Sequence, residues 1–388
     1  MNGLKNRGAL FVLLLAFALI VAACSSSDSD DTTTTAAGDT TETTVAGDTT
    51  ETTVAGETTT TAAGETTTTA GSMAGEGIKV GMAYDIGGRG DQSFNDSAAA
   101  GLDRAVTDYG IEAQELEPTA GGENREENLR LLAESGFELI FAIGFAFGDG
   151  VAATAPDFPD ATFGIIDSVV EEPNVASLVF AENEGSALVG AAAALKSQTG
   201  TIGFIGGVNI GLINKFEAGY RFGAEQINPD IEILVQYLTE PPDFSGFADP
   251  AKGKEAGIAM YDQGADVVYH AAGGSGGGLF EAAKETSETG DVKVWAIGVD
   301  SDQYMTAGDD VKEYILTSML KRVDVAVYRT ITDYVTSGQQ SGVLVFDLSA
   351  DGVGYSTSGG FVDDIKDQLE ELRVKIVSGD LVVPETVG

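Results

Sequence analysis

The chain has 388 residues, and its 61 acidic residues against 21 basic residues give a formal net charge of −40. A field of this sign repels nucleic acid and anionic lipid, so we expect no nucleic-acid partner. With one cysteine and one histidine, no intramolecular disulfide can form and the usual zinc ligands are missing. We expect no cofactor and no metal. A calcium site built from oxygen ligands alone remains an alternative, although the sequence contains no EF-hand loop.

The first residues are typical of a secretory signal peptide. Lys5 and Arg7 precede a continuous apolar run over residues 9–21, which is too short to span a membrane. The run closes with VAAC, and this ending resembles a lipobox, in which the cysteine is acylated and becomes the mature N-terminus. We therefore expect a lipoprotein signal peptide over residues 1–23 and a lipid on Cys24.

Residues 24–76 form a low-complexity segment of serine, threonine, alanine, glycine and acid, in which GDTTETTVA occurs twice. Such a composition buries too little apolar surface to offset the entropy of ordering, so we expect a disordered tether and not a repeat fold. A flexible coil of this length spans roughly 40 Å. The tether would hold a folded unit clear of a membrane surface.

Residues 77–388 alternate between short apolar runs and segments with helical spacing. The runs that predict strands are 78–84, 137–144, 162–167, 176–181, 201–207, 231–238, 265–273, 293–300 and 314–320. The segments that predict helices are 97–110, 125–136, 184–200, 215–228, 253–264 and 278–290. Strands that are apolar on both sides and followed by helices imply an α/β fold with parallel sheets covered on both faces.

The length of this part is enough for two doubly wound lobes with separate cores. We expect the first lobe to comprise residues 77–183 plus about 318–345, and the second to comprise 184–317 plus about 346–388. Residues 77–388 carry a formal charge of −32, because ten acidic residues lie in the tether and two basic residues lie in the signal peptide. We interpret this charge as a device for solubility and not as a site for a cationic partner.

Polar and aromatic residues directly after a strand are the candidates for a site, because ligands of open α/β sheets collect at the carboxyl ends of the strands. The candidates by this rule are Asp85 with the loop GDQSFN, followed by residues 144–150, 206–220, 270–278, 298–303 and 318–324. They are spread over the whole folded part. They converge only if the two lobes face one another across a cleft.

One motif resembles the nucleophile loop of a hydrolase but lacks the partner residues that such an enzyme needs. GGSGG at residues 273–277 fits the G-x-S-x-G pattern of a nucleophile elbow. The α/β-hydrolase order needs a histidine after the serine, but the only histidine, His270, precedes it. The same loop lacks the Lys-Ser or Lys-Thr of a P-loop. We therefore expect that the protein is not an enzyme and that His270 lies at the end of a strand without a catalytic role.

Several motifs occur in order between about residues 78 and 384. They are DQSFN, GFAFGD, GFIGG followed by KFEAGYRFG, GGLFEAAKE, VWAIGVDSDQ, TSMLKRVDVAVY and DGVGYS. With them the chain resembles the basic membrane protein family of substrate-binding lipoproteins, whose members resemble purine-nucleoside receptors of ABC transporters. The resemblance implies the fold of a type I periplasmic binding protein, in which two α/β lobes joined by crossing segments close on the ligand like a hinge.

The resemblance also implies site residues. In nucleoside-binding members the base lies between two phenylalanines, one from each lobe, and these positions match Phe94 and Phe216. A base stacked on an aromatic ring gains roughly 1 to 3 kcal/mol, whichever base it is. Alternatively, Phe94 packs inward as a staple at the start of a helix, and Phe216 lies on a helix face that meets the core.

Polar residues around these rings match the remaining contacts of the family. Asn95 donates and accepts, which suits a purine edge, and Asp149 accepts a ring N–H or an amine. Asp300 and Lys321 match the pair expected at the ribose hydroxyls. Alternatively, Asp300 and Lys321 pair only with each other, and Asp149 caps a helix.

Two further aspartates lie at the mouth of the same site. Asp85 and Asp91 are placed to reach the sugar or to fix the loop, and Asp91 also suits a helix cap. Gln92 departs from the family, where lysine is frequent at this position. This departure concerns the preference for one ligand over another and not binding itself.

These observations predict a protein that captures a solute without chemistry. We expect a lipid-anchored solute-binding protein on the extracytoplasmic face of the cell membrane, which delivers a nucleoside, in particular a purine nucleoside, to an ABC transporter permease. Two alternatives keep the fold. In one the ligand is a sugar or another small polar solute, and in the other the bound ligand is presented to a membrane sensor.

Overall fold

The structure, a computed structural model, describes residues 73–388. The expected signal peptide, the acylation site Cys24 and the tether up to residue 72 lie outside the described residues. The last tether residues, 73–76, form a turn beside the end of the first helix. The Gly75 N–H of this turn donates to the carbonyl oxygen of Tyr109, the last residue of that helix, at 2.9 Å.

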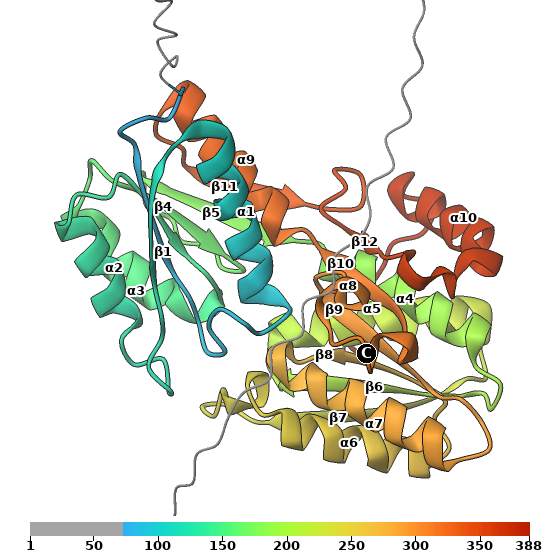
Figure 1. Cartoon of the computed structure of the whole chain (residues 1–388). Helices are drawn as coiled ribbons and strands as arrows, with labels where there is room; N and C mark the ends of the chain where they lie inside the picture. The colour runs from blue at the N-terminus through green and yellow to red at the C-terminus, as the bar shows by residue number, and fades with distance from the viewer. Residues whose placement is uncertain (1–72) are drawn as a thin grey trace, which may run out of the picture. The chain divides into compact units, whose positions relative to one another are not determined.

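The first sheet has six strands, and all neighbouring strands in it are parallel (Figure 1). In order across the sheet they are β11 (Gly342–Phe346), β5 (Val175–Phe180), β4 (Thr162–Ile166), β3 (Leu139–Ala142), β1 (Lys79–Ala83) and β2 (Glu112–Leu116). Every residue of the central strand β3 is buried, as expected for an apolar strand in a sheet with helices on both faces.

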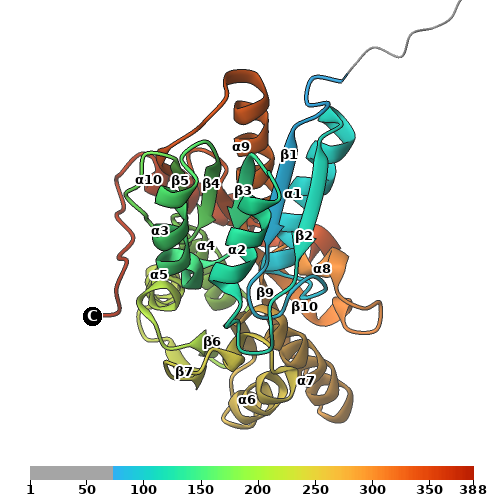
Figure 2. The same cartoon turned by 90° about the vertical axis from the view of Figure 1, so that its left-hand side faces the viewer.

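Four helices cover this sheet. Helices α1 (Phe94–Tyr109) and α9 (Val323–Ser337) pack together on one face, and α2 (Arg125–Glu134) and α3 (Gly148–Thr154) pack together on the other. Figure 2 shows α2 and α3 in front of strands β3, β4 and β5. We call this sheet with its helices the first lobe.

The second sheet also has six strands. In order across the sheet they are β12 (Val353–Tyr355), β10 (Ile315–Lys321), β9 (Trp295–Asp300), β8 (Val267–Ala271), β6 (Thr201–Val208) and β7 (Glu232–Thr239). All pairs are parallel except that of β10 with β12. The central strand β8 is buried along its whole length.

Helices cover both faces of the second sheet as well. Helices α4 (Glu182–Lys196) and α5 (Gly211–Ile227) pack together on one face, and α6 (Pro250–Asp262) and α7 (Gly276–Thr289) pack together on the other (Figure 1). The short α8 (Gln303–Thr306) follows β9, and α10 (Lys366–Val377) packs against α4. We call this sheet with its helices the second lobe.

Both lobes belong to one compact unit, and the chain of residues 73–388 crosses between them three times. The crossings follow β5, β10 and β11. Residues 318–321, which the sequence analysis assigned to the first lobe, lie in β10 of the second sheet, and α9 with β11 follow in the first lobe. A hinge motion between two lobes changes the backbone dihedral angles of a few loop or element-terminal residues, and these crossing segments are the residues that join the lobes.

Glycines allow α4 and α5 to pack with their backbones in contact. A Cβ atom at Gly223 would lie 1.8 Å from the Ala187 carbonyl oxygen, and one at Gly190 would lie 2.1 Å from the Tyr220 carbonyl oxygen. Such distances are shorter than any van der Waals contact. This close packing explains why two helices that cover the sheet contain glycine despite its low helix propensity.

The predicted α/β fold is confirmed. Each of the nine apolar runs that predicted a strand contains one, and each of the six segments with helical spacing contains a helix. Strands β2, β11 and β12 and helices α3, α8, α9 and α10 were not predicted from the sequence.

Candidate functional site

A cavity of about 690 Å³, including the part that opens to solvent, lies where the carboxyl ends of strands from both lobes meet. From the first lobe it is lined by Asp85, Ile86, Asp91, Phe94, Asn95, Gly144, Phe145 and Asp167. From the second lobe it is lined by Leu212, Ile213, Phe216, Phe244, Phe247, Ala271, Gly273, Val299, Asp300 and Lys321. Seven of the eight ligand-binding residues predicted from the sequence are among them.

Phe94 and Phe216 reach the cavity from opposite lobes. Phe94 is the first residue of α1 and is half-buried, while Phe216 lies in the second turn of α5 and is 3% exposed. The Nζ atom of Lys321 lies 5.2 Å from the centroid of the Phe94 ring and 5.5 Å from that of the Phe216 ring. Because one atom is close to both rings, the rings flank the same part of the cavity.

A second group of aromatic rings joins the lobes. Phe145, in the 3-10 turn η1 (Phe145–Phe147) after β3, faces Phe244 and Phe247, which follow β7. The ring centroids are 5.7 Å apart for Phe145 and Phe244 and 6.4 Å apart for Phe145 and Phe247, both with edge-to-face geometry. This geometry is favourable for aromatic pairs. The three rings form an apolar wall that both lobes contribute to.

Lys321, the last residue of β10, is buried between carboxylates. Its Nζ atom donates to Asp167 Oδ2 at 2.6 Å and lies 3.2 Å from Glu182 Oε1. Burial alone would lower the pKa of Lys321, but Asp167, Glu182 and Asp300 together raise it above its ordinary value, so the side chain stays a cation. An ammonium group has three donors, so one N–H remains for a ligand.

Asp300 ends β9 and is bonded across the cleft. Ser93 Oγ, from the first lobe, donates to Asp300 Oδ2 at 2.7 Å. Burial raises the pKa of Asp300 to about 7, although Lys321 and the Ser93 hydrogen bond act in the opposite direction. Lys321 forms ion pairs with Asp167 and Glu182. Within residues 73–388 it forms no direct ion pair with Asp300, which was the alternative prediction.

Besides a contact of Ser93 Oγ with the Val299 carbonyl oxygen at 3.2 Å, three more hydrogen bonds join the lobes beside Asp300. Ser301 Oγ donates to the Ser93 carbonyl oxygen at 2.8 Å. Gln303 Nε2 and Thr306 Oγ1 donate to the Gln92 carbonyl oxygen at 3.1 Å and 3.2 Å. We call these three bonds together with the Ser93–Asp300 bond the interlobe latch. Gln92 takes part through its backbone, and its side chain is exposed.

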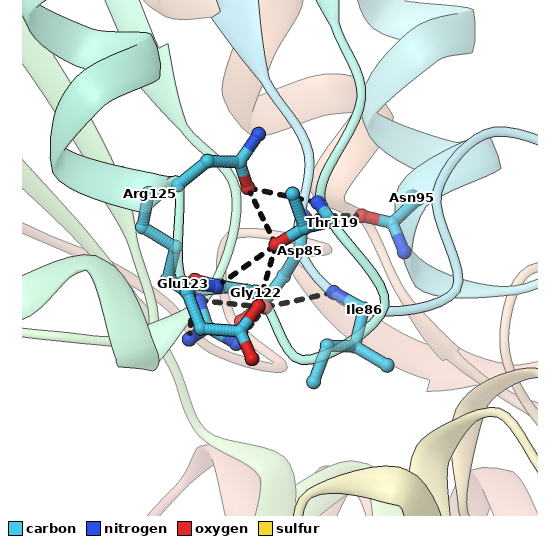
Figure 3. A network of polar contacts seen from close by, with 8 residues as sticks. Asp85, Ile86, Asn95, Thr119, Gly122, Glu123 and Arg125 are labelled. Carbon is cyan, nitrogen blue, oxygen red and sulfur yellow. Dashed lines mark hydrogen bonds and ion pairs between the residues drawn. The ribbon is translucent and has the colours of Figure 1, made fainter.

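Asp85 follows β1 and is bonded to Arg125 of α2 (Figure 3). Its Oδ1 atom accepts from Arg125 Nε at 2.8 Å, from a second guanidinium nitrogen of Arg125, and from the Ile86 N–H at 2.7 Å. Arg125 also donates to the Gly122 carbonyl oxygen at 3.0 Å. Burial raises the pKa of Asp85, and Arg125 opposes this shift. These bonds fix the loop after β1 at the cavity wall.

Asp91 and Asn95 organise the start of α1. The carboxylate of Asp91 accepts from the backbone N–H groups of Ser93, Asn95 and Asp96, which is the pattern of a helix cap. The Asn95 side chain donates to Asp91 Oδ2 at 3.0 Å and accepts from the Asp85 N–H at 3.3 Å. The two side chains therefore join the end of β1 to the helix that carries Phe94.

Asp149 is the one predicted ligand-binding residue that does not line the cavity. It lies exposed in the first turn of α3. The reason is local, because the 3-10 turn η1 follows β3 at once and leads into α3. Phe145 therefore lines the cavity at this strand end, and Asp149 lies one turn farther along the chain.

Four residues at or beside the cavity were not predicted from the sequence. Asp167 directly follows β4, so the rule of strand ends contains a signal for it. Glu182 opens α4 at the first crossing and is 1% exposed, which its sequence context of acidic residues does not indicate. Phe244 precedes the short 3-10 turn η3 (Ser245–Phe247) beyond β7, and Phe247 ends it; no sequence pattern in this connection distinguishes a cavity residue.

Ser275 and His270 have structural roles. Ser275 Oγ donates to the Gly246 carbonyl oxygen at 2.8 Å and accepts from the Asp249 N–H at 2.7 Å. His270 is buried in β8, with Nε2 3.0 Å from Gln303 Oε1, and burial lowers its pKa to about 4. The serine and the histidine thus have other partners, in accordance with the sequence argument against a hydrolase.

Within residues 73–388, no cluster of three or more His, Cys, Asp or Glu side chains is arranged to hold a metal ion. None of the helices formed by these residues has the length and hydrophobicity that a membrane-spanning helix requires.

Comparison with known proteins identifies relatives over almost the whole described part. The family described as ABC transporter substrate-binding protein, PnrA-like (Bmp), matches residues 78–387. The ABC transporter nucleoside-binding protein BmpA of Lactococcus lactis subsp. cremoris is 35% identical over 324 residues, which cover 79% of this chain and 89% of the relative. An uncharacterized lipoprotein of Pyrococcus furiosus is 35% identical over 322 residues, which cover 78% of each protein.

A solved structure shares both sequence and fold. The crystal structure of an ABC transporter system solute-binding protein from Aeropyrum pernix K1 is 32% identical to this chain. It superposes with a TM-score of 0.69, covering 79% of this chain and 94% of that protein. Together with the two six-stranded sheets, this likeness confirms the predicted architecture of a type I periplasmic binding protein.

Proposed function

The chain belongs to the Bmp family of ABC transporter substrate-binding proteins, and we propose that it captures a purine nucleoside between its two lobes and delivers it to an ABC permease. The family consists of binding proteins and not of enzymes. Ligand capture, lobe closure and release to a permease are therefore the steps to explain, and no covalent bond is made or broken.

The observation that carries this proposal is the pair of phenylalanine rings, Phe94 and Phe216, which flank one cavity from opposite lobes. A purine is planar, and each ring on which it stacks contributes roughly 1 to 3 kcal/mol. Because the rings belong to different lobes, both can contact the base only when the lobes are closed. Stacking thus supplies a difference in affinity between open and closed states, which is what drives closure.

Polar groups at the same cavity support a nucleoside over a plain aromatic ligand. Asp300 accepts and Lys321 donates, which is the combination that ribose hydroxyls require. Asn95 and Asp85 line the cavity on the first lobe beside Phe94, and their polar groups would face the edge of a base stacked on that ring. We leave Asp149 out of the contact set, because it is exposed and does not line the cavity.

We also propose that the protein is attached by a lipid on Cys24 to the extracytoplasmic face of the cell membrane. The VAAC ending of the signal peptide supports this attachment, as does the naming of a relative from Pyrococcus furiosus as a lipoprotein. The low-complexity segment up to residue 76 would then serve as the tether from which the lobes reach a permease.

Calorimetric titration of the purified protein with guanosine and inosine tests the nucleoside assignment. We expect Phe94→Ala and Phe216→Ala each to lower the affinity at least tenfold, equivalent to about 1.4 kcal/mol, because each variant removes one stacking surface. Phe222→Ala is the matched control, since Phe222 lies on the same helix as Phe216 and does not line the cavity.

Unchanged affinity in both ring variants would refute the proposed site. Titration with sugars and other small polar solutes distinguishes the ligand classes. Tight binding of a sugar by a protein that ignores nucleosides would refute the nucleoside assignment while leaving the family assignment intact.

A further inference from the structure

Asp167 is a buried carboxylate at the cavity that the contacts described so far do not explain. It directly follows β4, its side chain is 4% exposed, and it lines the cavity. Its Oδ2 atom accepts from Lys321 at 2.6 Å. Its Oδ1 atom is buried and has no hydrogen-bond partner among residues 73–388.

Two unfavourable features coincide at this residue. The backbone of Asp167 has a φ of +65°, in the left-handed region that is uncommon for residues other than glycine, although aspartate and asparagine adopt it more often than most. A buried carboxylate oxygen without a donor is also costly, since ionised groups lose their hydration on burial. Strained backbone and unpaired polar atoms persist mainly at functional sites, where a ligand completes the interactions.

We propose that Asp167 accepts a hydrogen bond from one of two adjacent hydroxyl groups of the bound sugar, so that the site selects ribonucleosides over 2′-deoxy and 3′-deoxy nucleosides. This inference rests on the proposed function and adds a residue and a specificity to it. The unpaired Oδ1 atom is the acceptor, and the bond of Oδ2 to Lys321 holds the carboxylate in place.

The neighbours of Asp167 fit a pair of adjacent hydroxyls. Asp300, which also lines the cavity, offers a second carboxylate, and the field of Lys321 acts on both. Two acceptors and one remaining ammonium N–H match a diol, in which each hydroxyl donates one hydrogen and the oxygens accept. A deoxy sugar would leave one of these buried groups without a partner, which is how a polar site rejects an analogue that lacks a hydroxyl.

The test compares guanosine, 2′-deoxyguanosine and 3′-deoxyguanosine by calorimetry with the full-length mature protein. We expect the wild type to bind guanosine at least tenfold more tightly than at least one of the deoxy nucleosides. In Asp167→Asn we expect weaker binding of guanosine and a loss of most of this discrimination, to about threefold or less. Asparagine is suitable because it tolerates a positive φ.

Glu182→Gln is the matched control. Glu182 also pairs with Lys321, at 3.2 Å, but it does not line the cavity. Its substitution perturbs the charge at Lys321 without removing a ligand contact, so the affinities for all three nucleosides should fall together and their ratio should persist. Equal discrimination in Asp167→Asn and Glu182→Gln would assign Asp167 a purely structural role and overturn the inference.

Other outcomes are also decisive. Equal affinity of the wild type for all three nucleosides overturns the inference and leaves nucleoside capture intact. Failure of the wild type to bind any nucleoside overturns the proposed function, and this inference with it. Should thermal denaturation show that Asp167→Asn is unfolded, Asp167→Gly replaces it, because glycine adopts the positive φ freely and removes the carboxylate.

Discussion

At the scale of single residues, the cavity combines groups whose protonation states depend on one another. Asp300 has a backbone φ of +63°, is 7% exposed, and accepts a hydrogen bond from Ser93 across the cleft. The groups with charge around it are Lys321, Asp167 and Asp91. Burial outweighs the attraction of Lys321, so the pKa of Asp300 rises to about 7. Asp300 therefore changes its charge close to neutral pH.

This pKa predicts how stability depends on pH. The pKa of Asp300 is about 7 in the folded protein and about 3.9 in an unfolded chain, so the folded protein retains a proton that the unfolded chain releases between these values. The contribution of Asp300 to the free energy of unfolding is therefore largest below about pH 4 and falls as the pH rises to about 7.

We expect Asp300→Asn, which cannot ionise, to escape this loss. The melting temperature of the variant minus that of the wild type, measured without ligand by circular dichroism, should increase from about pH 5 to about pH 8. Asp149→Asn, at an exposed position, is the control for the removal of one carboxylate. A difference that stays constant over this pH range would contradict the raised pKa.

The candidate site shows what sequence can predict about single residues. Phe94, Asp300 and Lys321 could be predicted from the sequence because they lie in motifs or at strand ends. The structure brings all three to one cavity. Asp167 carries the same signal of a strand end, but its role depends on an ion pair with Lys321, which lies 154 positions along the chain. Pairing over such a separation is set by the way the lobes pack, and local sequence contains no record of it.

At the scale of elements, the interlobe latch joins the loop before α1 to the segment between β9 and the end of α8. Two of its bonds, from Ser301 and Thr306, involve side chains that do not line the cavity. They act on closure and not on contacts with the ligand. A hydrogen bond of this kind contributes about 1 kcal/mol net.

We therefore expect the double variant Ser301→Ala, Thr306→Val to bind guanosine about tenfold more weakly, because the closed state loses two bonds. The weaker affinity should result from faster dissociation, measured by stopped-flow fluorescence or surface plasmon resonance, because the latch bonds have to break before the lobes can open and release the ligand. Thr336→Val is a control, because the Thr336 hydroxyl hydrogen-bonds only to neighbouring residues in the last turns of α9. An unchanged dissociation rate would show that the latch does not stabilise the liganded state.

The elements that sequence failed to predict have physical reasons in common. β2 is largely exposed and reads EAQEL, so neither apolar alternation nor a buried run marks it. β11 and β12 are short strands at the edges of their sheets, and β12 has only three residues. Edge strands are held by pairing with a neighbour, whereas the central strands were predicted because burial on both faces requires apolar residues.

At the scale of the whole molecule, negative charge is the dominant long-range feature. Residues 77–388 carry a formal charge of −32. Most of their ion pairs lie at the surface, such as Lys254 with Glu285 and Lys312 with Asp309, and surface pairs contribute about 0 to 1 kcal/mol each. Many acidic side chains of residues 77–388 form no ion pair within that part of the chain, so mutual repulsion opposes the compact state.

Screening of this repulsion should stabilise the protein. We expect the melting temperature to rise by a few degrees when NaCl increases from about 0.01 M to about 1 M, a range over which the Debye length falls from about 30 Å to about 3 Å. A triple variant tests the cause: Asp160→Asn, Glu171→Gln and Glu255→Gln replace exposed acids that form no ion pair within residues 73–388. The variant should melt at a higher temperature at low salt and respond less to NaCl. If the melting temperature instead fell with NaCl in both proteins, the surface ion pairs would stabilise the fold more than the repulsion destabilises it. That result would contradict the view that the excess of acidic residues increases solubility and lowers stability.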